Sequence, residues 1–317
     1  MARQIFTNIL GVFIFDERFS IIDKRLFEGL SQYESRQYYI EDIKKIYKEV
    51  IETKDQDLPI ILSQFKRSEF FIKFYERNLE LTKLDIKNSV KIDNLLIAAI
   101  STIEELDKSI NLLVKRLREW YELYNPEISK LIENHEKFIN TVIKKSKEEI
   151  LEQIRLYDKT SMGAEIEREH VNAIINLANH INELYRYKQS LEKYIFDIMK
   201  DICPNLLEVA GMSIGSKLIR HAGSFERLAV LPASTIQILG AEKALFRHLT
   251  NKKAKMPKYG IIFQHQLISN VQKNERGKAA RALSDKISIA VKVDRFRGKH
   301  IADQLIKELQ KRFGTWN

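Results

Sequence analysis

Only one cysteine, Cys203, occurs in the 317 residues of this chain. A single thiol excludes an internal disulfide and a metal site built from several thiolates, and we interpret Cys203 as a small buried hydrophobic residue. The sequence also lacks an apolar run of the roughly 18 residues that a membrane-spanning helix needs. Its first residues lead into a strand-like stretch without a signal peptide. We therefore expect a cytoplasmic protein with no membrane partner.

Motifs for catalysis and for cofactor or metal binding are missing as well. Gly211, Gly215 and Gly223 are separated by helical sequence and form no nucleotide-binding loop. The seven histidines show no metal-ligand spacing, since even His170 and His180 lie ten residues apart. No nucleophile stands in a motif with a base and an orienting acid. We therefore predict that the chain is not an enzyme and has no catalytic residues, no metal site and no cofactor.

Basic residues are concentrated in the last third of the chain. Residues 204–317 contain 21 Lys and Arg against 8 Asp and Glu, a net charge of +13, whereas residues 1–203 carry −3. A domain with such an excess of positive charge favours binding to nucleic acid or to an anionic membrane. The alternative is a solvated, lysine-rich surface of the kind found in heat-adapted proteins.

The first 85 or so residues have the pattern of a small α/β domain. The stretches 5–15 and 19–23 are rich in β-branched and aromatic residues and predict a β-hairpin. Apolar residues of 40–51 recur on one helical stripe and predict a helix. The stretch 58–65 fits a helix and a short strand equally well.

Residues 90–124 form the clearest helical pattern, with apolar residues at alternating steps of three and four. This heptad seam is typical of two helices that pack side by side. Pro126 predicts a break, after which the pattern resumes and runs to about 157. A second long helix over about 165–202 continues the same spacing. We expect the two long helices to pair antiparallel, with the stem of Lys188 extending past the seam.

The stretch 231–249, LPASTIQILGAEKALFRHL, is apolar and then abruptly charged. A proline followed by hydroxyl residues predicts a helix start, and Gly240 predicts its end. A further helix would begin near Ala241, and its first turn would present free amides beside Lys243 and Arg247. Helix N-termini bind phosphate in this way. Three apolar residues of this second helix are expected in the core: Leu245, Phe246 and Leu249.

This stretch resembles the Nop domain, as do PKYGIIFQH at 257–265 and GKAARALSDKISIAVKVDRF at 277–296. The approach to it, CPNLLEVAGMSIGSKLIRHAGSFERLAVLPAS at 203–234, resembles the same domain. Nop domains occur in the archaeal scaffold of box C/D ribonucleoproteins, in two eukaryotic nucleolar relatives and in a spliceosomal relative. Two further stretches resemble the archaeal scaffold: ILGVFIFDE at 9–17 and KRLREWYELYNPEISKLI at 115–132.

The resemblance implies a mainly α protein in three parts. Residues 1–85 would be a small α/β domain that binds the methyltransferase fibrillarin, and residues 86–203 a long antiparallel coiled-coil arm that forms a homodimer. Residues 204–317 would be an all-helical Nop domain that binds box C/D guide RNA together with a kink-turn-binding ribosomal-type protein. Helices in this last part are predicted over 205–211, 213–221, 224–230, 234–239, 241–250, 260–270, 276–292 and 300–312.

The residues implied by the resemblance fall into two sets. The RNA-binding set is Gly240, Ala241, Lys243, Arg247, Lys258, His265, Lys278, Arg281, Lys292 and Arg295. For His265, an ordinary hydrogen-bonded histidine is an equal alternative. Lys292 stands where the family commonly has arginine, so it keeps the charge but loses the bidentate fork. The dimerisation set lies on the predicted seams: Ile103, Leu106, Ile110, Leu113, Leu117, Ile181, Leu184 and Leu191.

The function implied is that of a non-catalytic scaffold for guide-RNA-dependent 2′-O-methylation of RNA by fibrillarin. The spliceosomal type is one alternative, and the resemblance at 9–17 and 115–132 disfavours it. A coiled-coil interaction protein without RNA binding is another, and the cations at 243, 247, 278 and 281 disfavour it. The lack of a lysine- and acid-rich tail favours an archaeal source.

Overall fold

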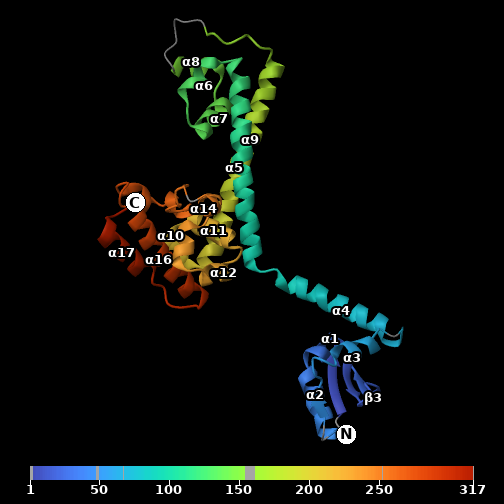
Figure 1. Cartoon of the computed structure of the whole chain (residues 1–317). Helices are drawn as coiled ribbons and strands as arrows, with labels where there is room; N and C mark the ends of the chain where they lie inside the picture. Colours follow the sequence, from blue (N-terminus) through green and yellow to red (C-terminus); the bar gives the residue numbers. More distant parts are fainter. Residues whose placement is uncertain (1–2, 48–49, 67, 154–160, 252, 317) are drawn as a thin grey trace. The chain divides into compact units, whose positions relative to one another are not determined.

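The computed structural model describes residues 3–47, 50–66, 68–153, 161–251 and 253–316 (Figure 1). These residues are mainly helical, and the described strands form one four-stranded sheet near the N-terminus. The chain divides into two compact units, Met1–Lys91 and Ile92–Asn317. The predicted class, mainly α with a small α/β N-terminal part, is confirmed.

The sheet of the N-terminal unit has the strand order β3-β2-β1-β4. Its strands are β1 (Arg3–Asn8), β2 (Gly11–Phe15), β3 (Ile21–Leu26) and β4 (Val50–Glu52). The first three pair antiparallel, and β4 lies parallel to β1. The sequence predicted one strand over 5–15, but the chain reverses at Ile9 and Leu10, so that this stretch forms two strands. Gly11 then passes close to β3, where a Cβ would lie 2.2 Å from the carbonyl oxygen of Arg25.

Helices cover both faces of this sheet, because the central strand β2 is buried on both sides. They are α1 (Leu30–Glu34), α2 (Arg36–Ile46), α3 (Leu58–Gln64) and α4 (Ser68–Ser89). Phe13 packs in one core with Ile61 of α3, and Ile14 packs in the other with Ile43 of α2. The helix predicted over 40–51 ends at Ile46 because the chain then enters β4. The ambiguous stretch 58–65 is helical.

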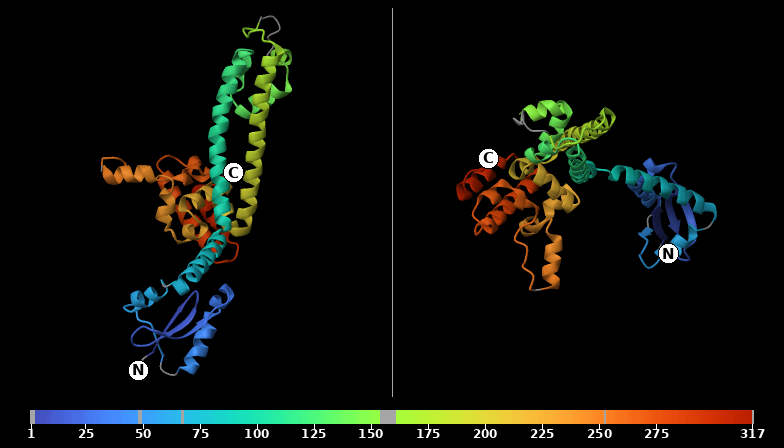
Figure 2. Two further views of the ribbon diagram at one scale, coloured as in Figure 1. Left: turned by 90° about the vertical axis from the view of Figure 1, so that its right-hand side faces the viewer. Right: turned by 90° about the horizontal axis from the view of Figure 1, so that it is seen from above.

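The second unit contains the predicted antiparallel arm (Figures 1 and 2). It pairs α5 (Ile92–Glu122) with α9 (Arg168–Ile202). The interruption of the seam at Lys188 is a cross-arm ion pair: its Nζ lies 2.6 Å from Oδ1 of Asp107 and 3.8 Å from Oε1 of Glu192. The lysine therefore ends on a carboxylate of the opposite helix rather than extending past it.

Three short helices replace the single helix predicted after Pro126. They are α6 (Pro126–Leu131), α7 (His135–Lys144) and α8 (Lys147–Gln153), and residues 154–157 of the prediction lie outside the described residues. Arg118 of α5 fixes the turn between α6 and α7, since its guanidinium donates to the carbonyl oxygens of Ser129 (2.8 Å) and Ile132 (2.7 Å). The guanidinium also lies over the ring of Phe138. The helical periodicity was correct, but these tertiary contacts break the helix.

The helices after the arm follow the predicted segments closely. They are α10 (Pro204–Ala210), α11 (Met212–Ala222), α12 (Phe225–Val230), α13 (Ala233–Ile238), α14 (Glu242–Thr250), the 3-10 helix η1 (Ile261–Gln264), α15 (Gln266–Asn270), α16 (Arg276–Arg295) and α17 (Ala302–Phe313). The segment predicted as one helix over 260–270 is split into η1 and α15.

The base of the arm and the C-terminal helices share one hydrophobic core. Leu96 of α5 and Met199 of α9 belong to the same buried cluster as Leu283 and Ile287 of α16. Cys203 is a free thiol, fully buried in this cluster, as the sequence suggested. The arm is therefore anchored to the C-terminal helices by apolar packing, which fixes where the basic surface described below lies relative to α5 and α9.

Candidate nucleic-acid interface

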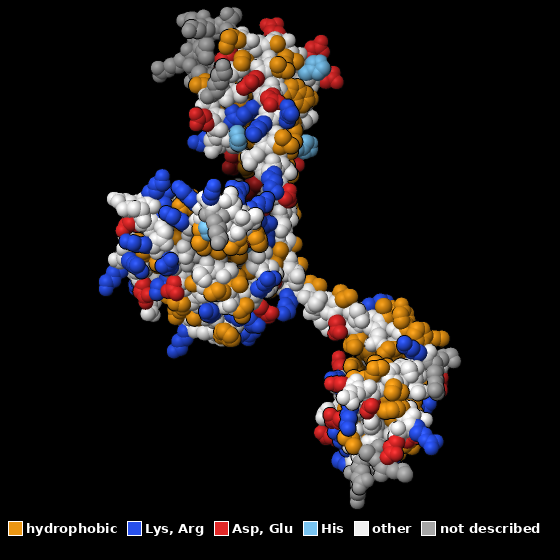
Figure 3. All heavy atoms as spheres, viewed as in Figure 1, with side chains coloured by type: hydrophobic (Ala, Val, Ile, Leu, Met, Phe, Trp, Pro, Cys, Tyr) orange, Lys and Arg blue, Asp and Glu red, His pale blue; other side chains and the backbone are white. Residues whose placement is uncertain are grey.

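The predicted RNA-binding cations are all on the surface of the C-terminal part of the chain. Figure 3 shows many Lys and Arg side chains over the visible face of this region. The exposed members of the predicted set are Lys243, Arg247, Lys258, Lys278, Arg281, Lys292 and Arg295. They fall into three groups: those on α14, Lys258 in the loop that follows it, and those on α16.

Helix α14 stands out from the rest of the domain together with the loop after it (Figure 2). It has no buried residue. Lys243 and Arg247 are four residues apart and therefore lie on one side of the helix. Within the described chain, neither side chain has an ion pair or a hydrogen bond. Two uncommitted cations on a projecting helix can bind phosphate groups without first giving up an internal contact.

The N-terminus of α14 is less open than the sequence predicted. Oε1 of Glu242 accepts a 2.7 Å hydrogen bond from the N–H of Gly240 and lies 3.6 Å from Nδ1 of His221. The N–H of Ala241 donates to the carbonyl of Ile238. Partial burial acts to raise the pKa of Glu242, but the amides of Gly240 and Glu242 and the neighbouring His221 together lower it. The Gly240 amide is thus held by a carboxylate and the Ala241 amide by a backbone carbonyl. This corrects the expectation that Gly240 and Ala241 present free amides to RNA.

The backbone conformation and the close packing at position 240 both require glycine. Its φ of +86° is unfavourable for a residue with a side chain. A Cβ at this position would lie 2.4 Å from Cγ1 of Ile261. Gly240 therefore lets the chain turn between α13 and α14 while it packs against η1.

The apolar residues of α14 correct a second prediction. Phe246 and Leu249 were expected in the core, but 65% and 64% of their surface is exposed. Met256, in the loop that follows, is 57% exposed. The loop is closed by a 2.6 Å contact between Nδ1 of His248 and the carbonyl oxygen of Ala254. The projecting segment thus presents apolar groups as well as cations, and such mixed surfaces mark protein interaction sites.

The cations of α16 divide between its two ends. Lys278 and Arg281 lie near the start, whereas Lys292 and Arg295 lie about 21 Å further along, at 1.5 Å per residue. All four face away from the buried side of the helix. Nη2 of Arg295 is 3.0 Å from Oε1 of Glu226, so this arginine is already in an ion pair. The predicted residues of α16 therefore make two separate basic positions rather than one.

His265 is part of the core and not of the exposed basic surface. It is 8% exposed, its Nε2 lies 3.2 Å from the carbonyl of Val209, and its Nδ1 accepts from the N–H of Leu267 at 3.1 Å. Burial lowers the pKa of His265, although the bond to Val209 acts against this. The imidazole is therefore enclosed and hydrogen-bonded, so of the two alternatives for His265 the structure favours an ordinary hydrogen-bonded histidine over an RNA contact.

The predicted dimerisation residues divide into fully buried and partly buried members. Ile110, Leu117 and Ile181 are at most 2% exposed within a single chain, because they fill the seam between α5 and α9. These three cannot face a second copy. The other members of the set are partly buried: Ile103, Leu106, Leu113, Leu184 and Leu191. Larger apolar exposure occurs at positions that the prediction left out: Leu112, Trp120, Tyr187 and Tyr194.

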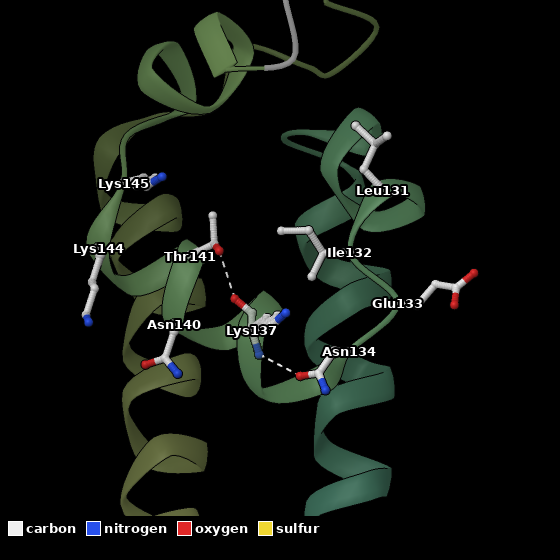
Figure 4. Close-up of a pocket in the computed structure, with 9 residues that line it drawn as sticks. All are labelled: Leu131, Ile132, Glu133, Asn134, Lys137, Asn140, Thr141, Lys144 and Lys145. Carbon is white, nitrogen blue, oxygen red and sulfur yellow. Dashed lines mark hydrogen bonds between the residues drawn. The ribbon is translucent and has the colours of Figure 1, made fainter.

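An open groove of about 700 Å³ lies beside α7 at the distal end of the arm, and sequence reasoning did not find it (Figure 4). Its lining includes Lys137, Lys144 and Lys145. Ile132 points into the space between α6 and α7, whereas Glu133 points away. The groove exists because Arg118 folds the chain back after α6, a contact with no signal in the local sequence. Its lysines can attract anions, but the groove contains no further feature that defines a ligand.

Groups of histidine, cysteine, aspartate or glutamate that could hold a metal ion are not found among the described residues. In the same part of the chain, no helix combines the length and apolar character needed to cross a membrane.

The second unit thus joins an antiparallel helical arm to a basic, all-helical domain. The family model described as "snoRNA binding domain, fibrillarin" matches residues 102–315. The chain belongs to this Nop family.

Three relatives illustrate the similarity. An uncharacterized NOP5 family protein of Methanocaldococcus jannaschii is 41% identical over 259 residues, covering 77% of this chain and 62% of the relative. Nucleolar protein 56 of Dictyostelium discoideum is 42% identical over 228 residues (66% and 42%). Nucleolar protein 58 of Schizosaccharomyces pombe is 38% identical over 223 residues (66% and 44%). The chain thus spans less than two thirds of the length of each of these relatives.

A solved structure, the crystal structure of a fibrillarin/Nop5p complex, contains a chain with 23% identity to this one. The two align over 98% of each chain with a TM-score of 0.46.

Proposed function

We propose that this protein is a non-catalytic scaffold of a box C/D ribonucleoprotein that directs guide-RNA-dependent 2′-O-methylation by fibrillarin. The observation that carries the proposal is the match of residues 102–315 to a family model whose description joins snoRNA binding with fibrillarin. A scaffold of this kind acts by placement. It raises the effective concentration of the methyltransferase at the target and restricts its orientation, while the chemistry stays with its partner.

The RNA partner is a box C/D guide RNA with a kink-turn, bound through the phosphate backbone. The net charge of +13 in residues 204–317 supports this assignment. So do the unpaired side chains of Lys243 and Arg247 and the exposed cations of α16. Phosphate contacts of this type set position and register rather than read sequence, and helical RNA is recognised mainly by its shape and backbone.

The kink-turn-binding protein would share this site. The projecting segment formed by α14 and its loop carries Phe246, Leu249 and Met256 beside the two cations. A surface that combines exposed apolar and basic side chains fits a partner that is itself a complex of RNA and protein. The apolar residues would bury against the small protein, and the cations would reach the adjacent RNA.

Fibrillarin would bind the N-terminal unit, because the stretch 9–17 resembles the corresponding domain of the archaeal scaffold. This unit exposes several large apolar side chains on α4, including Ile72 (64%) and Tyr75 (61%). The arm would join two copies through its exposed aromatic residues, Trp120, Tyr187 and Tyr194, and would thereby set the spacing of two bound enzymes.

A gel-shift experiment tests the proposal with the whole chain and a box C/D kink-turn RNA, with and without the kink-turn-binding protein. Binding that requires the small protein, and that weakens steeply with salt as phosphate contacts do, supports a composite site. Equal binding to any RNA of similar length reduces the basic surface to a nonspecific anchor. An unshifted RNA under all conditions contradicts the proposal and favours an interaction protein without RNA binding.

A further inference from the structure

The loop that follows α16 holds an exposed aromatic ring. Phe296 is 82% exposed, the highest value among the large hydrophobic side chains of the described residues. Burying such a ring stabilises a folded protein, and folding of this chain leaves that contribution unused. A single exposed apolar residue is common on protein surfaces, and its meaning depends on what holds it there.

The backbone around Phe296 is fixed at both ends. Its N–H donates to the carbonyl of Lys292 at 3.0 Å, and the N–H of Gly298 donates to the carbonyl of Val293 at 2.8 Å. Beyond the loop, Oδ1 of Asn205 accepts from the N–H of Ile301 at 2.7 Å. The ring is therefore presented by an anchored loop, and a ligand that binds it need not order the backbone first.

Arg297 adds an unusual conformation to this loop. Its φ is +51°, a left-handed value that glycine normally supplies at the end of a helix. This conformation is unfavourable for a residue with a side chain. Such strain is concentrated at functional positions. The chain here keeps a positively charged side chain directly after the exposed ring.

Basic residues flank Phe296 in the sequence. Arg297 and Lys299 are exposed, and neither forms an ion pair within the described residues. The nearby acids are already engaged: Glu226 pairs with Arg295 at 3.0 Å, and Glu208 contacts His300 at 3.1 Å. The segment between α16 and α17 thus combines a flat apolar face with free positive charge.

We propose that Phe296 stacks on an unpaired RNA base and that Arg297 and Lys299 bind the flanking phosphates. Every base has a π face, and aromatic platforms flanked by cations are a general means of binding single-stranded RNA. The proposal rests on the proposed function only in that the ligand is RNA. Phe296 lies about 27 Å along α16 from Lys278. Phe296 would therefore bind a single-stranded RNA segment that extends beyond the part of the RNA bound near Lys278.

The experiment compares two RNAs on the full chain with its kink-turn-binding protein: a kink-turn stem, and the same stem with a single-stranded extension. Stacking of one base corresponds to an affinity difference of about 5- to 150-fold. Phe296→Ala should remove most of the advantage of the extended RNA and leave binding to the bare stem unchanged. Phe296→Trp should retain the advantage. Adding the extended RNA should quench the tryptophan fluorescence of this variant more than that of the wild type, whose tryptophans are Trp120 and Trp316. Phe71→Ala, at a 51% exposed ring in the N-terminal unit, is the matched control.

Arg297→Gly provides an independent measurement. It should reduce the slope of log affinity against log salt for the extended RNA by about one contact, while the ring stays in place. If Phe296→Ala changes the affinity for neither the bare stem nor the extended RNA, the inference is overturned and the proposed function is left intact. Loss of both RNAs with Phe296→Ala also overturns it, because the residue would then act through the fold. If the stem does not bind at all, the proposed function fails, and titration with single-stranded RNA alone still tests Phe296.

Discussion

Asn205 and Asp294 lie 89 residues apart in sequence and are joined by a 2.6 Å hydrogen bond from Nδ2 of the amide to Oδ1 of the carboxylate. The carboxylate also accepts from the backbone N–H groups of Asn205 and Leu206, at the start of α10. Oδ1 of Asn205 in turn accepts from the N–H groups of Ile301 and Ala302, at the start of α17. One buried pair therefore caps two helices and ties both to the end of α16.

Replacement of Asn205 by alanine should lower the free energy of unfolding by about 3 kcal/mol, because two helix N–H groups lose their acceptor and Oδ1 of Asp294 loses one of its two donors in a buried site. Urea denaturation followed by circular dichroism measures the change. Asn172→Ala, on the exposed face of α9, is the matched control and should change stability by less than about 0.5 kcal/mol. Equal effects of the two substitutions would contradict the capping role.

Removal of two charges from α14, with Lys243→Ala and Arg247→Ala combined, should weaken assembly on kink-turn RNA by about tenfold or more. The melting temperature should not change, because α14 has no buried residue. Lys307→Ala with Lys311→Ala removes an exposed pair of the same spacing from α17 and serves as the control. An unchanged complex on a native gel would reject the α14 site.

The turn between α13 and α14 should not tolerate a side chain. Gly240→Ala combines the left-handed backbone with a Cβ 2.4 Å from Cγ1 of Ile261 and should destabilise the fold by about 2 kcal/mol. Ile261→Ala in the same chain removes the overlap but not the backbone strain. The double variant should therefore be more stable than the sum of the single changes predicts, by about 0.5 kcal/mol or more. Simple additivity in a denaturation cycle would show that the overlap is absent.

Tyr121 should make the arm sensitive to alkali. Burial raises the pKa of Tyr121 to about 12 from an ordinary value of 10.0, with smaller contributions from its neighbours. The folded state therefore holds this proton more tightly than the unfolded state. Stability is fully present below pH 10 and falls as the pH rises to 12, by about 3 kcal/mol in total. Denaturation at several pH values should show this slope in the wild type and a shallower one in Tyr121→Phe.

Residues inside and outside the arm seam should behave differently in a dimerisation assay. Leu117→Ala creates a cavity in a fully buried position and should lower stability by about 2–5 kcal/mol. Tyr187→Ala with Tyr194→Ala changes exposed residues seven positions apart on α9. This pair should leave the melting temperature unchanged and shift sedimentation toward the monomer. A dimer that survives the double change would place the interface on another surface.

Local patterns predicted the helices well where a helix is long or clearly bounded. The seam of α5 and α9 follows from three- and four-residue spacing, and the helix boundaries between the start of α10 and the start of α14 follow from prolines and glycines. The same patterns were misleading after Pro126. There, the guanidinium of Arg118 binds backbone carbonyls from 11 and 14 residues away and folds the segment into three short helices. Periodicity records which residues are apolar but not which distant side chain will interrupt the helix.

The candidate site shows the same division. Residue types alone place a large positive charge in the last third of the chain, and exposure of Lys243, Arg247, Lys278 and Arg281 follows from their charge. Burial of His265 against the carbonyl of Val209 depends on a contact between segments 56 residues apart. Exposure of Phe246 follows from the way α14 projects from the helices around it, and the hydrogen bond from the Gly240 N–H to Glu242 depends on the turn geometry between α13 and α14. Histidine and phenylalanine occur both in cores and on surfaces, so the residue type alone does not predict whether His265 or Phe246 is buried.

By itself, the sequence determined the helical class, the two arm helices and their seam, the basic C-terminal third and the Nop family resemblance. These properties are summed over many residues, so no single contact alters them. Only the tertiary structure decided which seam residues are closed within one chain, which of the ten predicted RNA contacts reach the surface, and that Phe296 stands exposed in an anchored loop. Each of these depends on a few contacts between segments far apart in sequence, such as Asn205 with Asp294, and these contacts exist only once the chain is folded.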